Sequence, residues 1–249
     1  SEFAKKHDIA NVYNGYRDLI KNSENWDAVV IAVNTENTIE VLNNFLIFKK
    51  PILVEKPISI TLGDFDNFNS IVSPVQVGYN RRFYSTVQRA KKFIEEKGPC
   101  LIKMELPEQV KLSEKEQDFH NVRTNSTHGL DILNYLLPDL EIIDVHDCGL
   151  SNNLGKMVSL KSSNGDLCSL LMSWNSPSNF SLTIDANPYR LELKPFEEYN
   201  LYEGMDIIHP TEDFPISKYV PKLIESGSVF SESKDFKPGF LEQAMEFYN

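Results

Sequence analysis

The chain has 249 residues, of which 41% are hydrophobic and 24% charged, and it carries a formal net charge of −11. This composition excludes the disordered and membrane-embedded classes, because no apolar run approaches the roughly 18 residues of a spanning helix. The acidic balance argues against nucleic-acid binding, which needs a basic face. We therefore expect a cytoplasmic protein of one large or two ordinary domains that binds neither nucleic acid nor membrane.

The first part of the chain shows buried strands and helices in alternation. We expect the end of a helix over 1–8, an extended piece over 9–13 and a short helix over 16–20. Residues 27–33 and 51–54 are short apolar runs without polar alternation, which is typical of parallel strands buried on both faces. The residues between them have apolar side chains at helical spacing and predict a crossover helix (Ile39, Val41, Leu42, Phe45, Leu46 and Phe48).

These segments predict a β-α-β unit with a right-handed connection. A helix over 62–71 and another buried strand over 74–80 follow it. In parallel sheets, ligands bind beyond the carboxyl ends of the strands. Asn34-Thr35 and Glu55-Lys56-Pro57 stand at two such ends, so they are the first candidates for a functional site.

Beyond residue 80 the pattern changes. An amphipathic helix is expected over 85–96, a strand over 101–106, a loop or irregular helix over 107–121 and a helix over 127–137. Five strand candidates follow, separated by turn signals (141–149, 156–162, 167–174, 179–185 and 190–194), and two helical patterns close the chain (215–226 and 238–248).

The later strands predict a mostly antiparallel sheet carrying a few helices, in a second domain that begins near Tyr79. Ser163-Asn164-Gly165-Asp166 is the clearest hairpin turn, because Asn-Gly tolerates positive φ. One sheet face should pack on helices. We hypothesise that the other face shows an apolar patch and forms a homodimer (Met172, Trp174, Phe180 and Leu182).

The cysteines and most histidines show no metal-binding pattern. Cys100, Cys148 and Cys168 are isolated and odd in number, which favours reduced thiols. Four histidines also lack the spacing of metal ligands, so no metal site is expected (His7, His120, His146 and His209).

Four short motifs occur in order along the chain: Asp27-Ala28-Val29-Val30-Ile31-Ala32, Leu53-Val54-Glu55-Lys56-Pro57, the stretch from Val77 to Phe83, and His128-Gly129-Leu130-Asp131. Together they resemble the glucose–fructose oxidoreductase / inositol dehydrogenase / MocA-like (Gfo/Idh/MocA) family of NAD(P)-dependent oxidoreductases. The resemblance covers nearly the whole chain, and the Glu-Lys-Pro stretch is its most specific mark. It implies an NAD(P)-binding Rossmann domain followed by an α/β domain with a large open sheet that is used for oligomerisation.

The family pattern is incomplete at the start of the chain. The glycine-rich loop G-x-G-x-x-G is absent from the sequence, and by register Ser1 falls after the second strand of the family. The resulting fold prediction is α/β: a partial Rossmann-type parallel sheet over 1–78, without its first βαβ unit, then an α/β domain over 79–249 with a large open, mostly antiparallel sheet. We expect the sequence to be an incomplete view of a longer protein at the N-terminus and also at the C-terminus.

The resemblance also assigns roles to individual residues. Lys56 and His128 are the catalytic candidates, and the pKa of Lys56 is expected to be depressed by partial desolvation and by the oxidised nicotinamide. The cofactor, NAD or NADP, would be bordered by the strand-end residues (Asn34, Thr35, Glu55, Lys56 and Pro57). The substrate would contact a set drawn from both domains (Lys56, Tyr79, Asn80, Arg82, Thr124, Asn125, His128 and Asp131).

Several positions leave an alternative open. Thr124 replaces an Asp that the family often has, Thr38 replaces its His, and Asn34 replaces its Pro. Glu55 has an equal claim to being a buried group bonded to backbone, and the arginine pair at 81–82 has the properties of a salt-bridge feature.

The sequence thus predicts an oxidoreductase that moves a hydride between nicotinamide and a sugar, cyclitol or nucleotide sugar, working as a homodimer or homotetramer through the open sheet. The alternative is a non-catalytic nucleotide- or sugar-binding or assembly protein with the same fold, and an unrelated α/β fold with an accidental Glu-Lys-Pro is a third reading.

Overall fold

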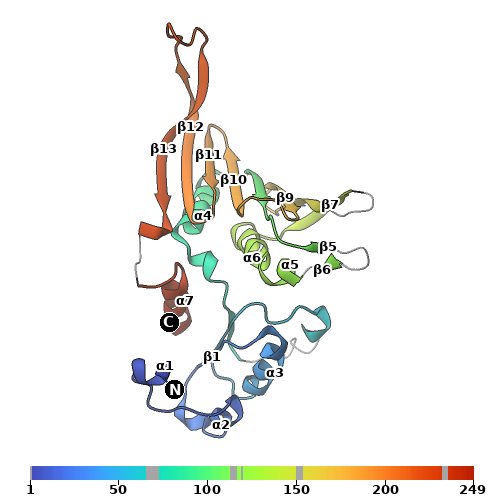
Figure 1. Cartoon of the computed structure of the whole chain (residues 1–249), viewed down its shortest axis with the longest axis vertical. Coiled ribbons are helices and arrows are strands. Elements are labelled where there is room, and N and C mark those ends of the chain that lie inside the picture. The colour runs from blue at the N-terminus through green and yellow to red at the C-terminus, as the bar shows by residue number, and fades with distance from the viewer. Residues whose placement is uncertain (1, 66–72, 113–116, 119, 150–153, 232–234) are drawn as a thin grey trace. The chain divides into compact units, whose positions relative to one another are not determined.

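The computed structural model describes residues 2–65, 73–112, 117–118, 120–149, 154–231 and 235–249 (Figure 1). The chain divides into two compact units, Ser1–Gly78 and Tyr79–Asn249. The first holds a small parallel sheet and the second a large mixed one. The predicted α/β class is therefore confirmed.

The first unit is built on three short parallel strands in the order β1 (Val29–Ile31), β2 (Ile52–Val54) and β3 (Val75–Val77). Helix α3 (Thr35–Leu46) connects β1 to β2, which confirms the predicted β-α-β unit. The helix is amphipathic, and its apolar face packs on the sheet because the strands offer Val and Ile side chains there. Seven buried residues make this core (Val29, Ile31, Val41, Leu42, Phe45, Ile52 and Val54).

The remaining elements of the first unit are short. Helices α1 (Glu2–Lys6) and α2 (Tyr16–Ile20) lie where helices were predicted, and a 3-10 turn, η1 (Ser23–Asn25), follows them. The expected extended piece over 9–13 pairs with no described strand. Of the helix predicted over 62–71, the structure shows a 3-10 turn, η2 (Leu62–Phe65), while residues 66–71 lie outside the described residues.

The second unit contains an eight-stranded sheet in the order β13-β12-β11-β10-β4-β9-β8-β7 (Figure 1). Among the described strands of this sheet, only the pair β4–β9 is parallel, so the sheet is mostly antiparallel as predicted. The strands are β4 (Leu101–Glu105), β7 (Glu141–Cys148), β8 (Gly155–Lys161), β9 (Leu167–Ser173), β10 (Ser181–Ala186), β11 (Tyr189–Leu193), β12 (Glu198–Ile208) and β13 (Lys218–Ser228).

One face of this sheet is covered by helices (Figure 1). Helix α4 (Ser85–Lys97) contacts β10, β11 and β13, and α6 (Thr127–Leu136) packs beside α4. The shorter elements are η4 (Asn80–Phe83), α5 (His120–Thr124), η5 (Val229–Ser231) and α7 (Phe240–Tyr248), the last of which contacts η4.

The predicted helix over 215–226 is wrong, because the structure places strand β13 there. The apolar spacing of this stretch suits either element, and pairing with β12 decides between them. Pro221 is tolerated because β13 is the edge strand of the sheet. The loop or irregular helix expected over 107–121 contains two paired short strands, β5 (Lys111–Leu112) and β6 (Gln117–Asp118), which the sequence prediction missed.

The hairpin turn predicted at 163–166 is confirmed between β8 and β9. Gly165 has φ +92°, a left-handed conformation that favours glycine. The turn is held by the buried side chain of Asp166, which accepts hydrogen bonds from Ser162 Oγ (2.5 Å) and from the backbone N–H of Cys100 (2.8 Å).

The prediction of which residues form the exposed apolar face of the sheet is wrong. Met172, Trp174 and Leu182 are buried in the core beneath the helices, and Phe180 is partly buried against it. Strand alternation separates two faces, but it does not say which of them the helices cover. The uncovered face and the outer part of the β12–β13 hairpin carry exposed apolar residues of their own, and oligomerisation stays a prediction (Leu101, Met157, Leu167, Met205, Ile207, Phe214, Ile216 and Tyr219).

The cysteines provide a first test of this core. Cys100 and Cys168 are buried, and burial raises their pKa to about 11 and about 12, whereas Cys148 is exposed. Because the thiolate is the reactive form, we expect one fast-reacting thiol per chain with a colorimetric disulfide reagent in neutral buffer, and three after denaturation in guanidinium chloride. Cys148→Ser should remove the fast phase. A fast phase that persists in this variant would contradict the placement of Cys100 and Cys168.

Candidate functional site

In the first unit, the predicted cofactor residues lie at one edge of the parallel sheet. Asn34 and Thr35 follow β1, while Glu55, Lys56 and Pro57 follow β2. Asn34 occupies the N-cap position of α3, where its carbonyl accepts hydrogen bonds from the N–H of Asn37 (2.8 Å) and from Thr38 Oγ1 (3.2 Å). Because all three strands are parallel, their carboxyl ends meet at this edge and bring these side chains together.

The strand-end backbone is fixed by hydrogen bonds that continue the ladder. The N–H of Glu55 donates to Ile31 O (2.9 Å), and the N–H of Gly78 donates to Val54 O (2.7 Å). Glu55 lies over the Cα of Gly78, since a Cβ built there would lie 3.2 Å from Glu55 Cδ. Because residue 78 is a glycine and has no Cβ, the Glu55 carboxylate has room at this edge of the sheet. Lys56 is partly buried and Pro57 is buried, and the peptide bond between them is cis.

This edge fits only part of a dinucleotide. Thr35, Glu55 and Lys56 supply a hydroxyl, a carboxylate and an amine, which are the groups that bind the hydroxyls of a nucleotide ribose. The glycine-rich loop that would bind the pyrophosphate is absent from the sequence. That these residues border NAD or NADP stays a prediction.

In the second unit, Arg82 of η4 and Asp131 of α6 form a bidentate ion pair. Arg82 Nε donates to Asp131 Oδ2 (2.6 Å), and Nη2 donates to Oδ1 (2.5 Å). The Asp131 side chain is 6% exposed and that of Arg82 is 36% exposed. Burial raises the pKa of Asp131, and the guanidinium opposes that rise, while the pair raises the pKa of Arg82. These two residues, both predicted to contact substrate, bind each other.

His128 lies beside this pair in the first turn of α6 and is 7% exposed. Its ring centroid lies 6.0 Å from that of Tyr79, edge to face, and the Arg82 guanidinium carbon lies 5.8 Å from the Tyr79 centroid. Burial raises the pKa of Tyr79. The structure thus gathers Tyr79, Arg82, His128 and Asp131 into one cluster.

The position of His128 depends on its neighbour in the chain. A Cβ built on Gly129 would lie 2.3 Å from Leu106 Cδ2, so only glycine allows α6 to pack this closely on the end of β4. This glycine belongs to the His-Gly-Leu-Asp motif. Its close packing on Leu106 holds the first turn of α6, which carries His128, against the end of β4.

Three further predicted substrate residues are tied within the second unit. Asn80 Nδ2 donates to Pro238 O (3.1 Å), which connects η4 to the segment before α7. Thr124 Oγ1 donates to His120 O (3.0 Å) in the helical manner. Asn125 Nδ2 donates to Glu108 Oε2 (2.8 Å). Their roles toward a substrate stay predictions.

Sequence reasoning considered the arginine pair at 81–82 but kept only Arg82 in the predicted substrate set. This residue lines a pocket of about 250 Å³ together with Asn125 and Glu197, whereas Arg82 turns to Asp131. Neighbouring arginines give no sequence signal that tells which of them forms an ion pair, because that depends on the distant Asp131.

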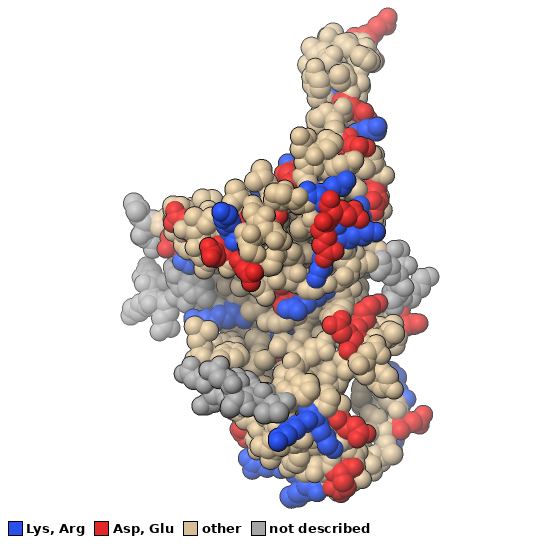
Figure 2. Space-filling model, turned by 180° about the vertical axis from the view of Figure 1, so that it is seen from behind, with Lys and Arg blue, Asp and Glu red and all other residues tan. Residues whose placement is uncertain are grey.

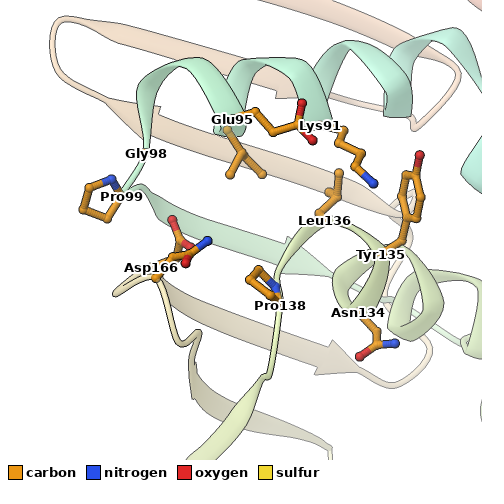
Figure 3. Close-up of a pocket in the computed structure, with 11 residues that line it drawn as sticks. Lys91, Glu95, Gly98, Pro99, Asn134, Tyr135, Leu136, Pro138 and Asp166 are labelled. Carbon is orange, nitrogen blue, oxygen red and sulfur yellow. The ribbon is translucent and has the colours of Figure 1, made fainter.

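A different pocket, of about 620 Å³, lies between the carboxyl-terminal ends of α4 and α6 (Figure 3). None of the predicted site residues lines it. Lys91 Nζ lies 3.8 Å from the ring centroid of Tyr135, and Asp166 holds the β8–β9 turn as described above. Lys91 and Asp166 in this pocket therefore have structural partners.

Three observations bound the chemistry of the described residues. No group of three or more His, Cys, Asp and Glu side chains among them is placed to hold a metal ion. None of the helices in the described part is long and apolar enough to cross a membrane. On the face of the second unit shown in Figure 2, basic side chains lie among acidic ones.

Comparison with known proteins gives a match over the first unit and a fold for the whole chain. Residues 1–74 match the family model GFO_IDH_MocA, described as "Oxidoreductase family, NAD-binding Rossmann fold". A search of curated proteins found no match. Among solved structures, a dehydrogenase (MviM) from Clostridium difficile has a TM-score of 0.69 at 15% identity, over 99% of this chain and 76% of that one.

Two further solved structures are similar. Levoglucosan dehydrogenase in complex with NADH and L-sorbose has a TM-score of 0.68 at 17% identity, over 99% of this chain and 76% of that one. UDP-N-acetylglucosamine 3-dehydrogenase GnnA from Acidithiobacillus ferrooxidans has a TM-score of 0.68 at 14% identity, over 99% and 75%. At these identities the likeness describes the fold.

The small parallel sheet of the first unit, followed by a unit with a large open sheet, is the α/β fold shared with these dehydrogenase structures, and the part of the first unit over residues 1–74 matches the NAD-binding Rossmann family model. The predicted resemblance is confirmed over residues 1–74, which match the Gfo/Idh/MocA family model, while the whole chain shares its fold with the dehydrogenase structures above.

Proposed function

We propose that this protein is an NAD(P)-dependent dehydrogenase that acts on a CH–OH carbon of a sugar, cyclitol or nucleotide sugar. One observation carries the proposal. Lys56 follows the central strand of a parallel sheet, inside the stretch that matches the NAD-binding family model, at the edge where such sheets bind their ligands. The similar structures with sugar ligands or nucleotide-sugar names support this substrate class.

Oxidation of a secondary alcohol requires two transfers. Bound NAD(P) would supply the hydride acceptor, so the chain has to bind the hydroxyl and remove its proton. Lys56 receives that proton at Nζ. In this proposal the neutral amine is the form that acts as a base.

His128 is the second acid/base group. An imidazole exchanges protons near neutral pH, and the packing of Gly129 on Leu106 holds it in one place. The Arg82–Asp131 pair joins η4 to α6 and so keeps the Tyr79 ring against the imidazole. In this proposal, the ion pair positions His128 and Tyr79, and the imidazole contacts the substrate.

The test is turnover by the full-length protein with a panel of sugars, cyclitols and nucleotide sugars and with NAD and NADP. With the best pair, His128→Gln is expected to lower kcat about 100-fold, at the lower end of what general acid–base groups contribute. The dissociation constant of the cofactor should stay unchanged. His209→Gln, at an exposed histidine, is the matched control. Equal turnover in the two variants would exclude the role of His128.

A second candidate function rests on Thr38 and Thr124. Both hydroxyls donate to backbone carbonyls of their own helical turns, and by the resemblance these positions lack the His (Thr38) and the Asp (Thr124) of the family. A protein that binds nucleotide or sugar without turnover would tolerate this loss. Calorimetry that detects cofactor binding, combined with no oxidation of any panel member, would favour this function.

A further inference from the structure

The pocket beside Arg81 has a polar lining drawn from four separate segments. Arg81 comes from η4, Asn125 precedes α6, Ser178 and Asn179 belong to the β9–β10 connection, and Glu197 lies in the β11–β12 turn. The remaining lining residues are apolar (Pro107, Phe180 and Pro195). Its volume of about 250 Å³ is below that of a typical whole-ligand pocket, so it suits one part of a ligand.

The two adjacent arginines differ in their charge partners. The guanidinium of Arg82 donates two hydrogen bonds to Asp131. Within the part of the chain that the structure describes, Arg81 has no carboxylate within ion-pair distance, and its guanidinium carbon lies 5.7 Å from the Phe180 ring centroid. Arg81 also bonds the Tyr84 side chain. A partly buried guanidinium without a carboxylate partner has five N–H donors in a planar fork, and this geometry matches a carboxylate or a phosphate.

Glu197 gives the pocket a second property. It adds a negative charge to the lining, so a small bare anion meets repulsion as well as attraction. Hydroxyl groups of a ligand donate to this carboxylate. The combination favours an anion that also carries hydroxyls.

The pocket is joined to the candidate acid/base group through the chain. The carbonyl of Asn125, which lines the pocket, accepts a hydrogen bond from the N–H of His128 (3.1 Å). Arg81 directly precedes the arginine that is paired to α6. Asn125, which lines the pocket, therefore stands three residues before His128 and is hydrogen-bonded to the backbone of that residue.

We infer that this pocket binds the carboxylate or phosphate group of an anionic sugar, and that Arg81 determines the preference for such substrates over neutral ones. The inference rests on the proposed function, since it names the substrate class of that same site.

The test compares three ligands that share one ring: D-glucose, D-glucuronate and D-glucose 6-phosphate. Calorimetry on the full-length protein with cofactor should show at least one anion binding about tenfold or more tightly than glucose. Arg81→Gln should weaken binding of that anion about 10- to 100-fold, as expected for loss of a charge-assisted hydrogen bond, and leave glucose unchanged. The two anions distinguish a carboxylate site from a phosphate site.

Two variants serve as controls. Arg190→Gln removes an arginine that is paired to Asp185 and lies outside this pocket, and it should preserve the preference for the anion. Arg81→Lys keeps the charge but loses the planar fork, so an intermediate affinity is expected. It also replaces the glutamine variant if that protein does not fold.

The outcomes separate the inference from the proposed function. Anions that bind no more tightly than glucose, or an equal loss for all three ligands in Arg81→Gln, overturn the inference, and turnover of a neutral sugar then leaves the proposed function standing. Arg81-dependent anion binding without oxidation of any ligand supports the inference and overturns the proposed dehydrogenase activity.

Discussion

Replacement of Lys56 by methionine is expected to lower kcat about 1,000-fold while the protein remains folded and binds its cofactor. The amine at the end of β2 is the proposed acceptor of the substrate proton, and general acid–base groups contribute about 100- to 10,000-fold. Methionine has a similar length and keeps the apolar stem in place. The sheet should therefore be undisturbed, because its core is formed by β1, β2 and α3. Steady-state and cofactor-binding measurements check this.

Two comparisons make the result specific. Lys49→Met changes an exposed lysine of the same unit and should leave kcat unchanged. Lys56→Ala opens space at the same position, so added methylamine is expected to restore part of its activity if the missing group acts as a base. Wild-type turnover in Lys56→Met would remove this lysine from the mechanism. A loss confined to cofactor affinity would assign it to binding alone.

Local chemistry made the first unit predictable. The runs at 29–31 and 52–54 are short, apolar and rich in Val and Ile, which predicts strands. The prediction that both strands are buried on both faces is wrong for β1, because Val30 is 62% exposed. The spacing between them admits a helix, and α3 occupies it. The polar residues after each run then follow at the sheet edge, which is why the sequence placed Asn34 and Lys56 together. Their roles in binding a cofactor remain proposals.

Long-range pairing limited the prediction of the second unit. Residues 215–226 read equally as helix or strand, and partnership with β12 selects the strand. Similarly, the alternation at Met172 and Leu182 was read correctly as two faces, but helices α4 and α6 decide which face is buried. Neither fact is contained in the local pattern.

The candidate site divides in the same way. The His-Gly-Leu-Asp motif marked His128 and Asp131 as a local feature of one helix. The partner of Asp131 lies 49 positions earlier in the chain, and no local rule selects Arg82 over Arg81. Sequence reasoning placed Arg82 in the substrate set and left a salt bridge open for the pair at 81–82. The structure shows an ion pair at Arg82 and Arg81 beside a pocket, and the substrate role of Arg82 stays a prediction.

Arg82→Met is expected to destabilise the protein by about 2–3 kcal/mol near neutral pH, and the loss should shrink as the pH falls. Removing one partner of a buried pair leaves an uncompensated charge, here the carboxylate of Asp131, and the cost lies at the low end because Arg82 is 36% exposed. Burial already raises the pKa of Asp131, and removing the opposing guanidinium raises it further. Urea unfolding followed by circular dichroism between weakly acidic and neutral pH measures this.

The direction of the pH effect follows from proton linkage. A carboxyl whose folded-state pKa lies above its unfolded value binds more protons when folded, so the penalty is smallest below the ordinary value of 3.8 and grows as the pH rises through the raised pKa. Arg89→Met is the matched control, because Arg89 holds the pKa of Glu225 below its ordinary value of 4.5.

Glu225 is 40% exposed, so the loss in Arg89→Met should stay below about 1 kcal/mol and be constant above that ordinary pKa. In Arg82→Met the loss should still grow over the same range, because, of these two carboxyl groups, that of Asp131 is the one with a raised pKa. Two parallel pH profiles would mean that water reaches Asp131 in the folded protein, and the ion pair would then not be what holds Tyr79 against His128.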